Sequence, residues 1–250
     1  MKQANPFSLQ LHSIESFGTH DGPGIRLVVF LQGCNIACKY CHNPDTISLH
    51  GGNPTDIDSL VEKAKRMKPY FSENGGVTVS GGEPLVQSKA LIPFFEALKK
   101  ENIHTNIDTN GTIRTPEAQE LLSNQADLVM FDIKSTHADG FKRITGQNHL
   151  DNLLANIALR EASKKPYWLR YVLVPEYTDG DESFQWLIDN FSENKYLERI
   201  EILPYNRLGV PKWEKLGWKY ELEHVVENTK AQTKRVHDLL VNHFKFVQVN

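Results

Sequence analysis

Residues 21–43 read DGPGIRLVVFLQGCNIACKYCHN, and they join a glycine-rich turn, a short apolar run and a loop that carries all three cysteines of the 250-residue chain. A short apolar run bounded by glycines indicates a buried strand. The cysteine loop then follows the carboxyl end of that strand.

The same alternation continues along the chain. The expected strands cover residues 25–31, 77–80, 104–108, 128–133, 168–174 and 200–203, and the expected helices cover 56–70, 89–100, 116–123, 150–162 and 181–191. Strands separated by helices pair in parallel, because a parallel neighbour needs a crossover connection. We therefore expect an α/β fold, a partial (β/α)6 TIM-like barrel over about residues 20–205, with its site in the loops after the strands.

The C-terminal extension, about residues 206–250, is expected to form a helix from 223 to about 243 and a short strand, FKFVQV. No repeat, low-complexity tract or Gly/Ser linker divides the sequence. We therefore expect one domain over residues 1–250.

Composition excludes several classes of protein. The net charge is -3 and the sequence pI is about 6.4, so the chain has no basic field that would hold a nucleic acid. The N-terminal stretch lacks a long apolar segment, and no apolar run is long enough to span a membrane. We expect a cytoplasmic protein, for which a monomer is the default.

The cysteines have the spacing C-x-x-x-C-x-x-C, at Cys34, Cys38 and Cys41. Three clustered thiols cannot form a disulfide framework and indicate a metal or cluster site. Three thiolates can bind a [4Fe–4S] cluster and leave one iron open to a substrate or cofactor. A zinc site that adds His42 is the alternative, although the adjacent side chains of Cys41 and His42 diverge.

Residues 21–43 resemble the signature of the glycyl-radical-enzyme activases in the radical S-adenosylmethionine superfamily. The similarity continues in order through HGG, GGVTVSGGEP, IHTNIDTNG, DLVMFDIK, WLRYVLVP and IEILPYN, and so covers nearly the whole chain. It implies an enzyme that binds [4Fe–4S] through Cys34, Cys38 and Cys41. It also implies S-adenosylmethionine, whose amino and carboxylate groups chelate the fourth iron and which is cleaved there to a 5'-deoxyadenosyl radical.

The resemblance further implies two protein partners. One is a glycyl radical enzyme, pyruvate formate-lyase or a close relative, in which one glycine loses a Cα hydrogen. The other is a small flavodoxin or ferredoxin that donates the electron. A radical enzyme for a small molecule and a non-catalytic zinc module are the competing hypotheses.

The resemblance also implies which residues bind the cofactor, because they stand at matching positions in the motifs. Tyr40 and His42 match positions near the adenine, with loop packing and a surface histidine as the alternatives. Gly81 and Gly82 would let the backbone approach the methionine part closely, and Glu83 would orient its ammonium group. A tight turn with an N-terminal acid is the alternative for this GGE segment.

Two strand ends resemble a site for a monovalent cation near the carboxylate of S-adenosylmethionine. It would be formed by Asp108 and Thr109 in DTNG with Met130 and Asp132 in VMFDIK, and helix-capping aspartates are the alternative. Lys134 is a candidate contact to the cofactor, with a solvent-facing lysine as the alternative.

Three further positions bear on binding. Asn206 stands where relatives often have a histidine that contacts the ribose; it can form hydrogen bonds but cannot stack or titrate like imidazole. Asp21 and Arg170 resemble residues that position the incoming glycine peptide, and a structural ion pair is the alternative for them.

Overall fold

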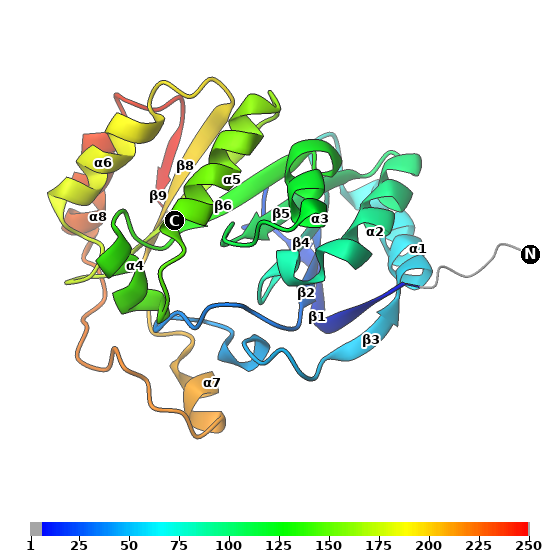
Figure 1. Ribbon diagram of the computed structural model, residues 1–250, viewed down its shortest axis with the longest axis horizontal. Coiled ribbons are helices and arrows are strands. Elements are labelled where there is room, and N and C mark those ends of the chain that lie inside the picture. Colours follow the sequence, from blue (N-terminus) through cyan, green and yellow to red (C-terminus); the bar gives the residue numbers. More distant parts are fainter. Residues whose placement is uncertain (1–6, 250) are drawn as a thin grey trace, which may run out of the picture. The chain divides into compact units, whose positions relative to one another are not determined.

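The structure is a computed structural model of the 250-residue chain, and it describes residues 7–249. Its strands form one open sheet among these residues, in the order β3-β1-β2-β4-β5-β6-β7-β8-β9 (Figure 1). β1 pairs antiparallel with β2 and with β3, whereas β2, β4 and β5 run parallel, as do β7, β8 and β9. The predicted α/β fold, parallel and open rather than a closed barrel, is confirmed.

Helices alternate with the strands through most of the chain. The strands are β1 (Ser8–Gly18), β2 (Arg26–Leu31), β3 (Asn53–Asp56), β4 (Gly76–Gly81), β5 (His104–Thr109), β6 (Leu128–Ile133), β7 (Tyr167–Leu173), β8 (Leu197–Pro204) and β9 (Val247–Val249). The α-helices are α1 (Ile57–Met67), α2 (Ser88–Lys100), α3 (Pro116–Glu120), α4 (Ala138–Thr145), α5 (Leu150–Ala162), α6 (Asp181–Phe191), α7 (Val210–Lys215) and α8 (Lys230–Leu240).

The chain divides into two compact units. The first contains the described residues up to Asn35 together with Thr46–Thr109 and Ile113–Met130. The second contains Ile36–Asp45, Asn110–Thr112 and the described residues from Phe131 onward. This division does not test the expectation of one domain, which stays a prediction.

In the first unit, β2 pairs in parallel with β4 and β4 pairs in parallel with β5, each without a register shift. Helix α1 packs on α2. Helix α1 begins where the Asp56 carboxylate accepts a hydrogen bond from the Ser59 amide at 3.0 Å. Its buried residues recur at helical spacing, which buries one stripe against the sheet.

In the second unit, β7 pairs with β8 and β8 with β9. Helix α8 begins with a capping box, in which Thr229 and Gln232 satisfy each other's backbone amides, and it packs on β9.

The sequence pattern missed several elements. β3 contains no large apolar residue, and Pro54 suits an edge strand because it donates no hydrogen bond. In β1 the apolar residues Leu9 and Leu11 alternate, but Ile14 falls in the opposite phase beyond a shift in the register with β2, which interrupts the strand pattern in the sequence. α4 and α7 are short, and α8 begins at Lys230 rather than near residue 223.

None of the helices among residues 7–249 is both long and apolar enough to cross a membrane.

Candidate functional site

Backbone atoms join the GGE segment to the end of β2. The amide of Gly82 donates to the carbonyl oxygen of Leu31 at 2.9 Å. A Cβ atom at Gly82 would lie 2.2 Å from the oxygen of Gly33, and one at Gly81 would lie 2.3 Å from the nitrogen of Leu31. The two glycines therefore allow two protein backbones to meet directly before Cys34. Their approach to a cofactor stays a prediction.

Glu83 is fully buried, and its carboxylate is held by hydrogen bonds within the first unit. Its Oε1 atom accepts from the Leu85 amide at 2.9 Å and from the Thr109 hydroxyl at 2.5 Å. This geometry caps the short 3-10 helix Pro84–Gln87. The turn with an N-terminal acid is thus present, and the contact of Glu83 with a cofactor remains a prediction.

One face of the first unit's sheet is polar, because residues at every second position share a face. Thr78 and Ser80 lie on this face of β4, and Asn106 and Asp108 lie on it in β5. Ser80 donates to the carboxylate of Asp108 at 2.9 Å. Thr78 and Asn106 both donate to the backbone oxygen of Asp21, at 2.6 and 3.1 Å. The loop that contains Asp21 is therefore held against this polar face.

Arg26, the first residue of β2, was not among the residues predicted from the sequence. Its guanidinium is fully buried and donates to the carbonyl of Val77 at 2.6 Å and the hydroxyl of Thr78 at 2.9 Å. Burial lowers the pKa of Arg26, and the carboxylates of Asp127 and Asp21 oppose that change. A charged residue inside an otherwise apolar run was the available signal.

The second part of the cysteine loop, Ile36–Asp45, belongs to the second unit. The amides of Ala37 and Lys39 donate to the carbonyls of Thr145 and Ile144 at 3.2 and 2.9 Å, where α4 ends. Burial raises the pKa of the Cys38 thiol to about 12.

Cys41 is held close to Cys38, because the Cys41 amide donates to the Cys38 carbonyl at 3.0 Å. Burial also raises the pKa of the Cys41 thiol, and a backbone hydrogen bond from Asn43 opposes that rise. Both thiols therefore hold their protons near neutral pH, and binding of a metal would release them.

Three predicted cofactor residues come together beside this loop. The Nζ atom of Lys134 donates to the carboxylate of Asp132 at 2.8 Å and lies 5.7 Å from the ring centre of Tyr40. Burial lowers the pKa of Lys134, but Asp132 and Tyr40 have the larger combined effect. The pKa of Lys134 is therefore raised. Tyr40 is 7% exposed, and its hydroxyl has no hydrogen-bond partner among the described residues.

Two other predicted residues also meet. The Nε2 atom of His42 lies 3.4 Å from the backbone oxygen of Asn206. The side chain of Asn206 accepts from the Leu208 amide at 3.1 Å, so it also stabilises its own turn. Their contact with adenine or ribose stays a prediction.

Arg170 forms an ion pair with Glu201, a buried residue that the sequence reasoning missed. The Nε–Oε2 distance is 3.3 Å, and Arg199 approaches the other oxygen of Glu201 at 3.2 Å. Arg199 also stacks on Trp168 and Phe246, with its guanidinium carbon 3.9 and 4.6 Å from their ring centres. Arg170 thus takes part in an ion pair, and its role in peptide positioning is untested.

The remaining assignments are not tested by this geometry. Cys34 and Met130 belong to the first unit, whereas Cys38, Cys41 and Asp132 belong to the second. Within residues 7–249, no three His, Cys, Asp or Glu side chains lie together as a ready metal site. Ligation of a cluster and of a monovalent cation therefore stays a prediction.

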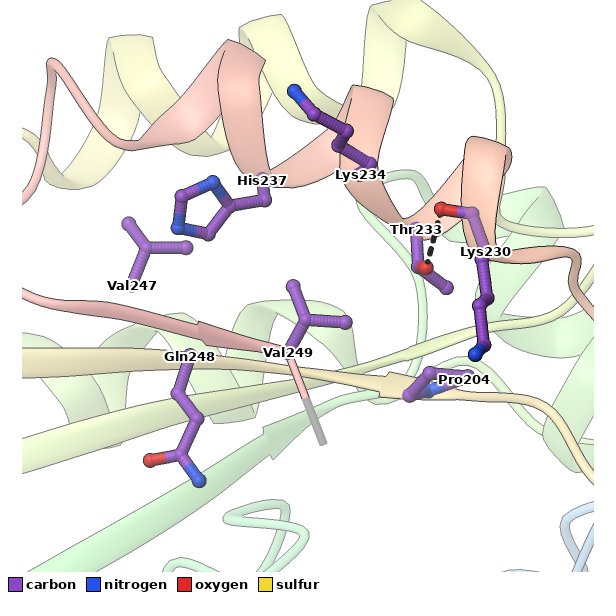
Figure 2. A pocket seen from close by; sticks show the side chains of 8 residues that line it. All are labelled: Pro204, Lys230, Thr233, Lys234, His237, Val247, Gln248 and Val249. Carbon is purple, nitrogen blue, oxygen red and sulfur yellow. Dashed lines mark hydrogen bonds between the residues drawn. The ribbon is translucent and has the colours of Figure 1, made fainter.

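A cavity of about 490 Å³ lies beside α8 and β9 (Figure 2). Its lining residues are Pro204, Lys230, Thr233, Lys234, His237, Val247, Gln248 and Val249. None of them is a predicted site residue, so this cavity is separate from the candidate site.

Comparisons with known proteins identify a family and similar sequences. The family model described as the Radical SAM superfamily matches residues 28–187. The chain is 42% identical over 234 residues to the pyruvate formate-lyase-activating enzyme of Clostridium pasteurianum, covering 92% of this chain and 96% of that protein. The enzyme of the same name from Staphylococcus aureus (strain USA300) is 42% identical over 224 residues, covering 86% and 88%.

Solved structures share the fold. Streptococcus suis SuiB bound to its precursor peptide SuiA matches with a TM-score of 0.70 at 18% identity, covering 95% of this chain and 50% of SuiB. A domain of the pyruvate-formate lyase-activating enzyme from Bacteroides vulgatus matches with a TM-score of 0.58 at 18% identity, covering 70% of this chain and 99% of that domain.

Proposed function

We propose, because this chain belongs to the radical SAM superfamily, that its cysteine loop and GGE segment serve the activation of pyruvate formate-lyase. The single observation that carries the proposal is the 42% identity to a protein of that activity across 92% of the chain.

The chain is a radical S-adenosylmethionine enzyme whose cofactors are a [4Fe–4S] cluster and S-adenosylmethionine. Cys34, Cys38 and Cys41 would hold the cluster, which together with S-adenosylmethionine would supply the radical chemistry that removes a Cα hydrogen from a glycine of the partner enzyme. The protein's contribution is to bind, orient and exclude competing groups.

The donor set fits an iron–sulfur cluster. Cys34, Cys38 and Cys41 offer soft thiolate ligands, and Cys38 and Cys41 come from one turn in which their backbones are bonded. The buried Tyr40 hydroxyl, which has no partner among residues 7–249, leaves a hydrogen bond to be made when the site is filled. In this proposal Lys134 brings a buried positive charge next to the loop.

The first unit would contribute the binding surface for the methionine part. Gly81 and Gly82 remove side-chain bulk, and the buried Glu83 lies beside them with an orientation fixed by Thr109. The proposed monovalent cation would be bound by Asp108, Thr109, Met130 and Asp132.

The protein substrate would be held by Asp21 and Arg170. The backbone oxygen of Asp21 is held against the polar face of the first unit's sheet, and Arg170 is held by its ion pair with Glu201. A glycine suits this chemistry because its Cα atom carries no side chain that would block access. A small flavodoxin or ferredoxin would donate the electron to a cytoplasmic monomer.

Anaerobic reconstitution tests the proposal. The expected protein is brown and holds about four irons and four sulfides. When it is reduced and mixed with S-adenosylmethionine and pyruvate formate-lyase, electron paramagnetic resonance should show the doublet of a glycyl radical. A protein that binds zinc and no inorganic sulfide would refute the function.

A substitution separates the two roles of the site. Arg170→Gln should retain cleavage of S-adenosylmethionine and lose most of the glycyl radical, since Arg170 is assigned to the peptide. Equal loss of both signals would contradict that assignment, and a doublet only with another glycyl radical enzyme would change the partner.

A further inference from the structure

A short helix far along the chain packs one face on the cysteine loop. Lys212 and Trp213 of α7 lie on that face together with Gly209, the residue that caps the start of the helix, because residues three and four apart are neighbours on a helix. Lys212 donates to the side chain of Asn43 at 2.7 Å. A Cβ atom at Gly209 would lie 2.8 Å from the carbonyl oxygen of Cys41, so helix and loop are in close contact.

The indole of Trp213 makes the most directional of these contacts. Its Nε1 atom donates to the carbonyl oxygen of Cys41 at 2.9 Å, and the side chain is buried. The ring packs edge to face against Trp218 and Tyr220, with centroids 6.0 and 5.7 Å away. The hydroxyl of Tyr220 lies 2.8 Å from that of Tyr205. The aromatic cluster therefore restricts the indole to the orientation that reaches Cys41.

This bond fixes the peptide plane that follows Cys41. The carbonyl and the thiol belong to the same residue, and the allowed side-chain rotamers depend on the backbone dihedral angles, so a fixed backbone at Cys41 restricts the directions that the thiol can take. We propose that Trp213 is a positioning residue that holds Cys41 ready for cluster binding. This inference rests on the proposed function, because it assigns the thiol as a ligand. Residues that orient metal ligands typically change affinity or activity by about 10-fold to 100-fold.

Hydrogen exchange of the metal-free protein tests the positioning itself. In Trp213→Phe, amides of the loop at residues 38–45 should exchange about fivefold to tenfold faster, which corresponds to loss of one hydrogen bond. Trp218→Phe is the matched control, because Trp218 belongs to the same cluster and, among the described residues, its indole gives no hydrogen bond to the loop. Unchanged exchange in Trp213→Phe, or equal acceleration in both variants, would overturn the inference.

Cluster retention provides the second readout. Reconstituted Trp213→Phe should lose iron to a chelator about tenfold faster than the wild type, and its reduced cluster should show an altered electron paramagnetic resonance spectrum. Trp218→Phe should match the wild type in both. Wild-type retention and spectrum in Trp213→Phe would overturn the inference.

Two further outcomes remain decisive. A wild-type protein that takes up no sulfide refutes the proposed function, while the exchange comparison still decides the role of Trp213. Should Trp213→Phe fail to fold, benzothienylalanine at position 213 retains the ring shape and removes the N–H donor. Wild-type exchange in that protein would refute the inference, and faster exchange confined to the loop would support it.

Discussion

Replacement of Gly82 by alanine tests the contact between the GGE segment and the end of β2. The new Cβ atom would lie 2.2 Å from the oxygen of Gly33 and 3.0 Å from that of Thr46. Since nonbonded carbon and oxygen atoms do not approach so closely, the two segments must separate by roughly 1 Å. Two backbone hydrogen bonds join them, from the Gly82 amide to the Leu31 carbonyl at 2.9 Å and from the Glu83 amide to the Gly33 carbonyl at 2.8 Å.

Each of these bonds contributes about 1 kcal/mol, so the loss of both would cost about 2 kcal/mol. The restricted unfolded chain of the alanine variant offsets about 0.5 to 1 kcal/mol of this. Gly82→Ala should therefore lower the free energy of unfolding of the metal-free protein by about 1 to 1.5 kcal/mol, measured by urea denaturation.

Gly146→Ala is the matched control. Gly146 has a φ of 85° and no atom within 4 Å of an added Cβ, so only its left-handed backbone is strained. That strain costs about 1 to 2 kcal/mol. Unfolding of Gly82→Ala within about 0.5 kcal/mol of the wild type, the usual range for an innocuous surface change, would refute the reasoning.

Three further predictions follow from single groups. Cys38→Ala should abolish cleavage of S-adenosylmethionine, assayed as 5'-deoxyadenosine release, because the cluster would lose a ligand; unimpaired cleavage would contradict the cluster assignment. Thr109→Val removes the 2.5 Å hydrogen bond to the buried Glu83 carboxylate and should cost about 1.5 to 3 kcal/mol in urea unfolding, whereas Thr109→Ser should recover most of it. Burial raises the pKa of Tyr171 to about 12, so below pH 10 its proton is held in both states, and above pH 10 only the unfolded state loses it. The free energy of unfolding should therefore fall by about 1 kcal/mol between pH 9 and 11 through this group. Tyr171→Phe should remove that part of the decline, as measured by urea unfolding at the two pH values.

The sequence predicted the elements whose signal is local. Strands β2, β4, β5, β6, β7 and β8 are apolar runs at or near their expected positions, because burial on both faces requires such runs. The pairing of Lys134 with Asp132 could be expected in part, since residues two apart share a face of a strand. Most of the strands could therefore be predicted from hydrophobic periodicity, and the candidate cluster loop could be predicted from the cysteine spacing.

Other features had no local signal. The hydrogen bond from Trp213 to Cys41 joins residues 172 positions apart, and nothing near either residue predicts it. Glu201 reads as the polar member of an alternating strand, yet it is buried because Arg170 and Arg199 balance its charge. Such contacts depend on which distant segments the fold brings together.

The indole that binds the carbonyl of Cys41 also gives the protein an intrinsic optical reporter. Of the four tryptophans, Trp213 is the one bonded to the cysteine loop in the described structure, so its fluorescence should respond to changes in that loop. An iron–sulfur cluster absorbs near the emission of tryptophan and would quench it. Rapid-mixing fluorescence can then follow cofactor assembly in real time without an attached dye, with Trp213→Phe as the blank.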